Sequence, residues 1–232
     1  MQEKYHVMLG DVVSSRTIAD RPNFQKKLEN ACNDVNLNYR NDIFAEFKIS
    51  KGTDEIAGVL VDISNIFKII TLFFDYLYPY QIRFALVYDY IDVSMDIRDV
   101  TKMDGPAFHK ASSDINELKL IGTSFKFSVY DLIVDSAIEN EINLLFMIKS
   151  DWSLLQHNII KEYMKLGKQT EVANKLGTSQ TFVSRTIHKL RWKELSYIEE
   201  NLNYMLLRYQ QRLLGRNKIG CSSIDRNSDF RD

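Results

Sequence analysis

Cysteine is almost absent from this 232-residue sequence, and proline and glycine are sparse, with two, three and nine residues respectively. Cys32 and Cys221 lie far apart and have no metal-ligand spacing, which disfavours a disulfide framework or a zinc site. Because 45% of the residues are hydrophobic and 12% aromatic, a low-complexity or disordered chain is excluded. These features indicate a packed protein of a reducing compartment.

Long apolar runs are also missing. The most hydrophobic stretch, residues 63–77, contains Lys68 and Asp75 and is shorter than the ~20 residues that a membrane-spanning helix needs. The N-terminus has no apolar segment long enough for a signal peptide. No GxGxxG loop, P-loop or Ser-His-Asp arrangement occurs, so a Rossmann cofactor site and a hydrolase triad have no support. We therefore expect a cytoplasmic protein with no membrane partner.

Charge is distributed unevenly, although the formal net charge is only −1. Residues 1–150 carry 16 basic and 22 acidic side chains, whereas residues 151–215 carry 10 basic and 6 acidic ones. The basic excess is concentrated between 161 and 193, where eight bases accompany two acids, Glu162 and Glu171. A basic segment of this kind favours a nucleic acid as partner, although a solvated helix face gives the same pattern.

Hydrophobic periodicity predicts an α+β domain over residues 1–149. The expected strands lie at 6–13, 43–50, 55–61, 81–93 and 125–130, and the expected helices at 20–39, 64–77 and 106–118. The order β-α-β-β-α-β, followed by α-β, is typical of a ferredoxin-like antiparallel sheet with helices on one face. We place a linker near 149–151, an all-α domain at 150–215, and a disordered tail at 216–232 because of its Asn, Ser and Asp content.

The segment 169–190, QTEVANKLGTSQTFVSRTIHKL, has the spacing of a helix-turn-helix. Ala173 is small enough for two helices to approach closely, and Gly177 supplies the positive φ that a tight turn requires. Ser179 is suited to cap the second helix, and Val183 follows the glycine by six residues. The agreement of these spacings is more specific than a lone glycine-containing turn.

The second helix of this motif would present polar side chains that suit DNA. Gln, Arg, Ser and Thr can hydrogen-bond to base edges in the major groove, and Lys and Arg bind phosphates. We therefore predict a DNA-binding domain within about 151–192. Its candidate contact residues are Lys168, Ser179, Gln180, Thr181, Ser184, Arg185, His188, Lys189 and Arg191. The alternative is a helical hairpin that packs on the other domain or binds a protein.

Beyond the motif, apolar residues recur at intervals of three and four. They are Leu195, Ile198, Leu202, Met205, Tyr209 and Leu213. This spacing approximates an a/d seam over nearly three heptads. The preferred interpretation is a homodimer that presents two recognition helices to DNA. The alternative is packing against the N-terminal domain of the same chain.

Carboxylates occur at two places that a ferredoxin-like sheet would bring together. Asp11 ends the first strand, and Asp54 and Glu55 lie at the hairpin between the second and third strands. Carboxylates so placed can hold Mg²⁺. The residues suited to the phosphates of a nucleotide are Ser14, Ser15 and Arg16. Acidic residues are common in surface loops, so a solvated hairpin without a metal is the alternative.

Four segments together carry a family resemblance. GDVVSSR at 10–16, TDEIAG at 53–58, DGPAFHKA at 104–111 and the helix-turn-helix follow one another in the order of the SatD family, which the chain resembles over nearly its whole length. Members show GD-x-x-x-SR, GDEFQG, DGPA and then a DNA-binding-type module. Their N-terminal half resembles class III nucleotidyl cyclases and related palm domains. The resemblance implies that Asp11 and Asp54 match the two metal-binding aspartates of those domains.

This sequence departs from those patterns at several positions. Thr53 replaces the expected glycine, and Ile56-Ala57 replaces Phe-Gln. Cyclases place Asn and Arg on the helix after the glycine that matches Gly105, where this sequence has His109 and Ser113. Because those cyclase side chains stabilise the transition state, the resemblance implies a retained metal and nucleotide pocket without cyclase chemistry.

We therefore expect a cytoplasmic DNA-binding regulator whose cyclase-like domain senses a nucleotide or a metal, with no catalytic residue assigned. The alternative is a Mg²⁺-dependent nucleotidyl cyclase or transferase that the helix-turn-helix recruits to its partner. A protein with a purely structural interaction role is the third hypothesis.

Overall fold

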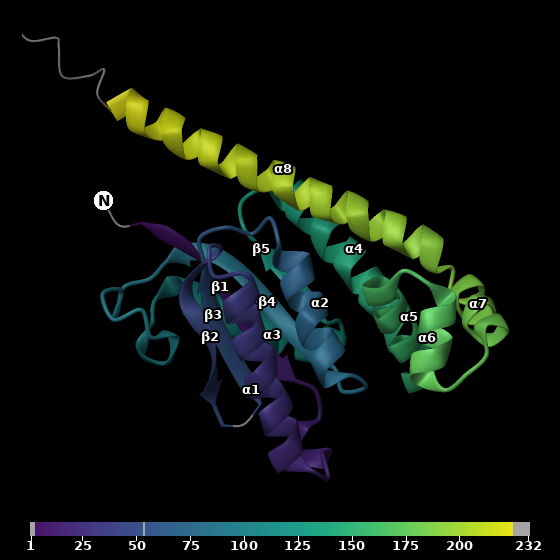
Figure 1. The fold of residues 1–232 in the computed structure, drawn as a ribbon. Coiled ribbons are helices and arrows are strands. Elements are labelled where there is room, and N and C mark those ends of the chain that lie inside the picture. The colour runs from purple at the N-terminus through teal and green to yellow at the C-terminus, as the bar shows by residue number, and fades with distance from the viewer. Residues whose placement is uncertain (1–2, 53, 225–232) are drawn as a thin grey trace, which may run out of the picture.

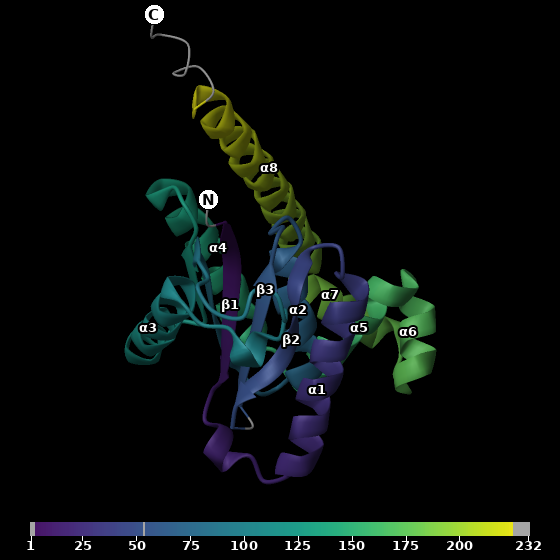
Figure 2. The same cartoon turned by 90° about the vertical axis from the view of Figure 1, so that its left-hand side faces the viewer.

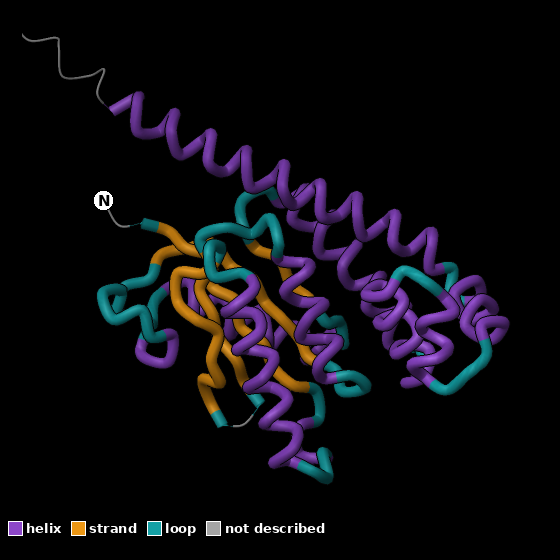
Figure 3. Tube along the Cα trace, viewed as in Figure 1, coloured by secondary structure: helices purple, strands orange, loops and turns teal. Residues whose placement is uncertain are grey.

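The computed structural model describes residues 3–52 and 54–224, which form an α+β fold with a five-stranded mixed sheet and eight α-helices (Figures 1 and 3). Its first part comprises β1 (Lys4–Val12), α1 (Arg21–Asn38), β2 (Ile43–Lys51), β3 (Glu55–Leu60), α2 (Ile66–Leu77), β4 (Ile82–Tyr90), α3 (Pro106–Ile121), β5 (Phe125–Ser128) and α4 (Leu132–Ser150). Short 3-10 helices lie at η1 (Ser15–Thr17) and η2 (Val100–Lys102). The remaining helices are α5 (Leu154–Leu166), α6 (Gln169–Leu176), α7 (Gln180–Lys189) and α8 (Trp192–Ile224).

The sheet has the strand order β2-β3-β1-β4-β5. Strands β2, β3, β1 and β4 pair antiparallel, and β5 pairs parallel with β4 because the α3 crossover returns the chain in the same direction. The register of the central strand pairs Asp11 with Glu55 on β3 and with Arg83 on β4. Three charged residues therefore lie side by side at one end of the sheet.

Helices cover both faces of this sheet, which corrects the expectation of helices on one face. Figure 2 shows α1 and α2 on one side of the strands and α3 on the other. Met8 of β1 lies in the main core with α1 and α2, whereas its neighbours Val7 and Leu9 pack in the core under α3. The apolar runs of β1 and of β4, residues 84–87, are continuous because both faces of these strands are buried.

Helices α5, α6 and α7 form a compact unit with a small core of its own. Ile159, Val172, Ala173 and Val183 make this core and are at most 3% exposed. The unit follows α4 after a connection at 151–153, close to the predicted linker, and the domain boundary itself stays a prediction. A capping box at the start of α5 satisfies backbone groups that a helix end leaves unpaired.

Helix α8 passes over α2 and α4 and projects beyond them (Figure 1). Leu195, Leu202, Tyr209 and Leu213 from the predicted seam are buried in the main core, and Met205 packs against it. Only Ile198 is exposed. The preferred dimer interpretation of this seam is therefore wrong, and packing within the chain, the alternative, is what the structure has.

Polar contacts hold α8 on the sheet unit as well. The Tyr209 hydroxyl donates to Asp135 Oδ1 at 2.7 Å and accepts from the Asp131 backbone N–H at 2.9 Å. The Ile63 backbone N–H donates to Gln210 Oε1 at 3.3 Å. Because these groups are directional, they fix the rotation of α8 about its own axis.

The predicted disordered tail also requires a correction. Helix α8 continues to Ile224, so residues 216–224 are helical, and residues 225–232 lie outside the described residues. The three prolines of the chain precede residue 107, so none interrupts α8. The Asn and Ser content that suggested disorder lowers helix propensity without ending a helix.

Candidate functional site

The predicted metal site begins with Asp11, which is held by two cations. Lys119 from α3 places Nζ 2.8 Å from Asp11 Oδ1, and Arg83 from β4 places a guanidinium nitrogen 3.6 Å from Asp11 Oδ2. The side chains of Asp11 and Arg83 are 15% and 17% exposed, so this ion pair is only partly screened by solvent. Sequence reasoning missed both partners, because only the strand register and the α3 crossover bring them to Asp11.

Asp54 and the predicted phosphate-binding loop do come together. The Ser15 hydroxyl donates to Asp54 Oδ2 at 2.5 Å, and the Val12 backbone N–H donates to the Asp54 carbonyl at 3.0 Å. Ser14 adopts a left-handed conformation with φ 54°, and Arg16 is exposed. The predicted neighbourhood of strand end and hairpin is therefore present, but Asp11 and Asp54 bind different partners.

Glu55 faces a cavity on the α3 side of the sheet. The Ser50 hydroxyl donates to Glu55 Oε1 at 3.0 Å, and Asp104 and His109, 3.4 Å apart, line the same cavity of about 400 Å³. His109 is exposed. Ser113 is exposed as well but does not line the cavity.

Metal binding at this place stays a prediction. Among residues 3–52 and 54–224, no three His, Cys, Asp or Glu side chains cluster as metal ligands would. Thr53, next to Asp54, lies outside the described residues. The cations beside Asp11 supply the charge compensation that Mg²⁺ would otherwise supply.

The motif glycines near this site have packing roles. A Cβ on Gly10 would lie 2.7 Å from Ile56 and 2.8 Å from Phe84, so a side chain there would displace the core. Gly105 has φ +147°, and its Cβ would approach the Asp92 backbone nitrogen to 2.8 Å. These glycines let the strands and the start of α3 approach closely.

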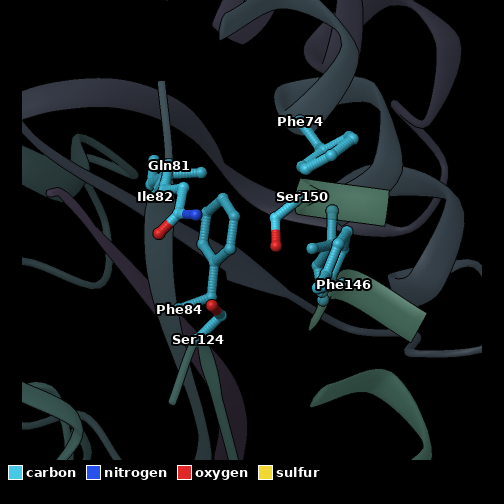
Figure 4. A pocket seen from close by; sticks show the side chains of 8 residues that line it. Phe74, Gln81, Ile82, Phe84, Ser124, Phe146 and Ser150 are labelled. Carbon is cyan, nitrogen blue, oxygen red and sulfur yellow. The ribbon is translucent and has the colours of Figure 1, made fainter. Parts of the chain in front are cut away.

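A small apolar pocket lies elsewhere, between β4 and α4. Figure 4 shows Phe84 on one side of it and Phe146 and Ser150 on the other. Its volume is about 20 Å³, which holds about one water molecule. This pocket is a packing gap and not a ligand site.

The turn between α6 and α7 has the predicted geometry. Gly177 adopts a left-handed conformation with φ 64° and is the C-cap residue that ends α6. Ser179 caps α7, because its hydroxyl accepts from the Phe182 backbone N–H at 3.2 Å. Val183 is fully buried against α5 and α6, and Thr186 is buried beside it, which the apolar pattern did not predict.

The predicted DNA-contacting residues lie at the surface. All nine are exposed except Ser184, which is half-buried. Three of them contact neighbours: Lys168 pairs with Glu171 at 3.0 Å, Gln180 with Gln169 at 2.7 Å, and Arg191 with Glu194 at 3.6 Å. Ser179 is occupied as a cap. The other five side chains, Thr181, Ser184, Arg185, His188 and Lys189, make no hydrogen bond or ion pair within the described part of the chain.

Lys175 of α6 is exposed but engaged inside the unit. Its Nζ lies 2.6 Å from Glu162 Oε2, and this hydrogen bond lowers the pKa of the Glu162 carboxyl. The contact ties α6 to α5. Lys175 is therefore less available to a phosphate than the free Lys189.

A comparison with protein families now adds to this geometry. A model of the SatD family matches residues 5–193. The chain belongs to the SatD family. The matched region includes the five strands, except the first residue of β1, together with α1–α7, so the family match spans both units as one continuous segment. The matched region ends just after the start of α8.

A search of the curated proteins found no match for this SatD-family chain. In the described ranges, none of its helices has both the length and the apolar character that crossing a bilayer takes.

Proposed function

We propose that the chain is a cytoplasmic DNA-binding regulator in which α5–α7 form a helix-turn-helix and α7 is the recognition helix. One observation carries this proposal. Thr181, Arg185, His188 and Lys189 are exposed on α7, and their side chains have no polar partner among the described residues. Because no protein group occupies these donors and acceptors, they are available to base edges and phosphates.

The shape of the unit supports the same proposal. A recognition helix contacts bases with its N-terminal residues, and Gln180 and Thr181 occupy the first turn of α7. Arg185, one turn further on, has the fork of donors that suits a guanine edge. Lys168, at the start of α6, and Arg191, just after α7, are exposed and suit phosphates.

DNA titration over a range of salt concentrations tests this function. Wild-type protein should bind genomic fragments with an affinity that falls as salt rises. Arg185→Ala should lose ~1–3 kcal/mol on the preferred fragment, and Lys168→Ala should weaken binding to all fragments and lower the salt slope by about one. If the wild type shows no salt-sensitive DNA affinity, the regulator proposal is rejected.

We further propose that the sheet unit is ferredoxin-like and cyclase-like, and that it senses a nucleotide or Mg²⁺. The order β2-β3-β1-β4, with α1 and α2 on one face, supports the ferredoxin-like assignment. The rival is a Mg²⁺-dependent cyclase or transferase. Two observations favour sensing. Lys119 and Arg83 already contact Asp11 on β1, and His109 and Ser113 are exposed where cyclases have Asn and Arg.

A nucleotide panel with Mg²⁺ separates sensing from catalysis. Sensing predicts that one nucleotide raises the melting temperature without forming product, and that Asp11→Asn abolishes the rise. The matched control Asp20→Asn, at the exposed cap of α1, should keep it. Cyclic nucleotide or pyrophosphate that disappears in Asp54→Asn would favour the enzyme instead.

We also propose a homodimer, because helix-turn-helix proteins commonly read two half-sites. Its interface would use the exposed apolar residues of α8 and not the buried ones. These are Tyr197, Ile198, Tyr204, Leu207 and Leu214. Light scattering at micromolar concentration should give twice the chain mass, and a monomer would reject the dimer.

A further inference from the structure

A large pocket lies between the sheet unit and the helices that flank α7. Its walls come from α1 and α2 on one side and from α5 and α8 on the other. Its volume is about 590 Å³, inside the ~300–1,000 Å³ range of small-molecule sites. The pocket is separate from Asp11, Glu55 and the α7 surface, none of which line it.

Aromatic and apolar side chains form one part of the pocket lining. Phe67, Leu72 and Tyr76 contribute from α2, Met164 from α5, and Trp192 from the start of α8. These aromatic side chains suit a planar ligand, because aromatic groups stack and bury large apolar areas. The lining therefore selects for an aromatic molecule.

The charged groups of the pocket are compensated within the protein. Asp75 Oδ1 lies 2.8 Å from His157 Nε2, the Asp75 carbonyl accepts from Lys161 Nζ at 3.0 Å, and Glu199 pairs with Lys149. The Tyr76 hydroxyl donates to Asp34, and this hydrogen bond raises the pKa of Tyr76 to about 12.

At the exposed edge of the pocket, Lys165 and Glu200 have opposite signs. Lys68 and Asp34, which also line the pocket, have opposite signs as well. With Lys149 beside Glu199, the basic and acidic side chains balance, and no net charge remains for a ligand to neutralise. The pocket therefore suits an uncharged ligand.

Two buried polar atoms in the pocket lack partners in the described part of the chain. They are Thr71 Oγ1 on α2 and Asn203 Oδ1 on α8. The Asn203 amide nitrogen donates to the Glu199 carbonyl at 2.8 Å, so its oxygen is left to accept a hydrogen bond. Buried polar groups are rarely left unpaired, so these two atoms indicate where the polar end of a ligand binds.

We propose that this pocket binds an uncharged, planar aromatic small molecule that carries a hydrogen-bond donor for Asn203 and a polar group for Thr71. Because the ligand would contact α5 and α8, which both pack against α7, its binding changes the affinity of α7 for DNA. This coupling, but not the binding itself, rests on the proposed DNA-binding function.

Neutral bicyclic aromatics with one N–H or O–H group, such as indole and 2-naphthol, are the probes. Saturation-transfer NMR and thermal shift on the full chain should show at least one probe binding with a dissociation constant below about 1 mM. Asn203→Leu, which removes the acceptor, and Ser196→Phe, which fills the pocket, should each weaken that probe about tenfold or more. Asn201→Leu, exposed on α8 outside the pocket, should leave the affinity unchanged.

The outcomes separate the two parts of the proposal. If no probe binds, or if both pocket variants bind it like the wild type, the ligand site is overturned. If the probe binds and the wild type binds DNA with an affinity that the probe does not change, the coupling is overturned. If the probe binds and the wild type binds no DNA, the DNA-binding function fails while the ligand site stands.

Discussion

The polar side chains in two regions of this molecule have opposite surroundings. Where α5 and α8 meet the sheet unit, charged groups are buried and paired, as in Lys149 with Glu199 and Asp75 with His157. On α7, Arg185 and its polar neighbours are exposed and unpaired within the described ranges. Residue type alone therefore does not separate charged groups that hold the fold together from those that are available to a partner. The contacts of each side chain do.

The predicted metal site lies elsewhere but resembles the first region, because its carboxylates also have partners within the protein. Asp11 is bound by Lys119 and Arg83, and Asp54 accepts from Ser15. Residue type and loop position suggested Mg²⁺ ligands there, but the carboxylates have protein partners. Their contribution to function therefore has to be tested against a contribution to stability.

The largest effect should come from breaking the buried pair. Lys149→Met leaves Glu199 charged in surroundings that expose only 10% of its side chain, and should lower the free energy of unfolding by ~3–5 kcal/mol. The double variant Lys149→Met with Glu199→Leu should recover most of this loss, because no unpaired charge remains. Chemical denaturation measures both. A loss below about 1 kcal/mol in the single variant would show that the pair is not isolated from solvent.

A second prediction concerns pH. Burial lowers the pKa of His6 to about 3, from 6.5 for an exposed histidine, so the folded protein keeps this ring neutral while the unfolded chain takes up a proton. The stability contribution is complete above pH 6.5 and is lost as the pH falls from 6.5 toward 3, by about 1.4 kcal/mol per unit. His6→Phe, which can still stack on Tyr88, should flatten this dependence. Chemical denaturation between pH 4.5 and 6.5 measures the free energy of unfolding of both proteins. The same pH dependence in the wild type and in His6→Phe would contradict this prediction.

The smallest change in stability should come from α7. Arg185→Ala removes a side chain without protein partners and should alter the free energy of unfolding by less than about 0.5 kcal/mol. Val183→Ala, two positions away in the small core, removes two buried methyl groups and should cost about 1.6 kcal/mol. Equal losses in the two variants would remove the contrast between the exposed and the packed side of α7.

Local patterns predicted the order of the elements and the turn before α7. Gly177 and Ser179 have the predicted backbone and capping roles, because a tight turn and a helix start depend on nearest neighbours. The continuous apolar runs of β1 and β4 are typical of strands that are buried on both faces, and they indicate a sheet covered on both sides.

Long-range contacts could not be predicted in the same way. The seam of α8 has the same spacing whether its partner is a second chain or α2 and α4, so Leu202 alone does not distinguish them. Arg83 and Lys119 reach Asp11 through strand register and a crossover that no local pattern specifies. Metal and ligand predictions failed to include these residues for that reason.

Whether DNA contacts α7, as proposed, can be read residue by residue from the amide chemical shifts of the full chain during titration with the fragment that binds most tightly. We expect shifts and line broadening to concentrate at residues 180–189 and at Lys168, and we expect Arg185→Ala to reduce them while the fold is retained. Changes confined to the sheet unit or to α8, with α7 unperturbed at saturating DNA, would contradict it.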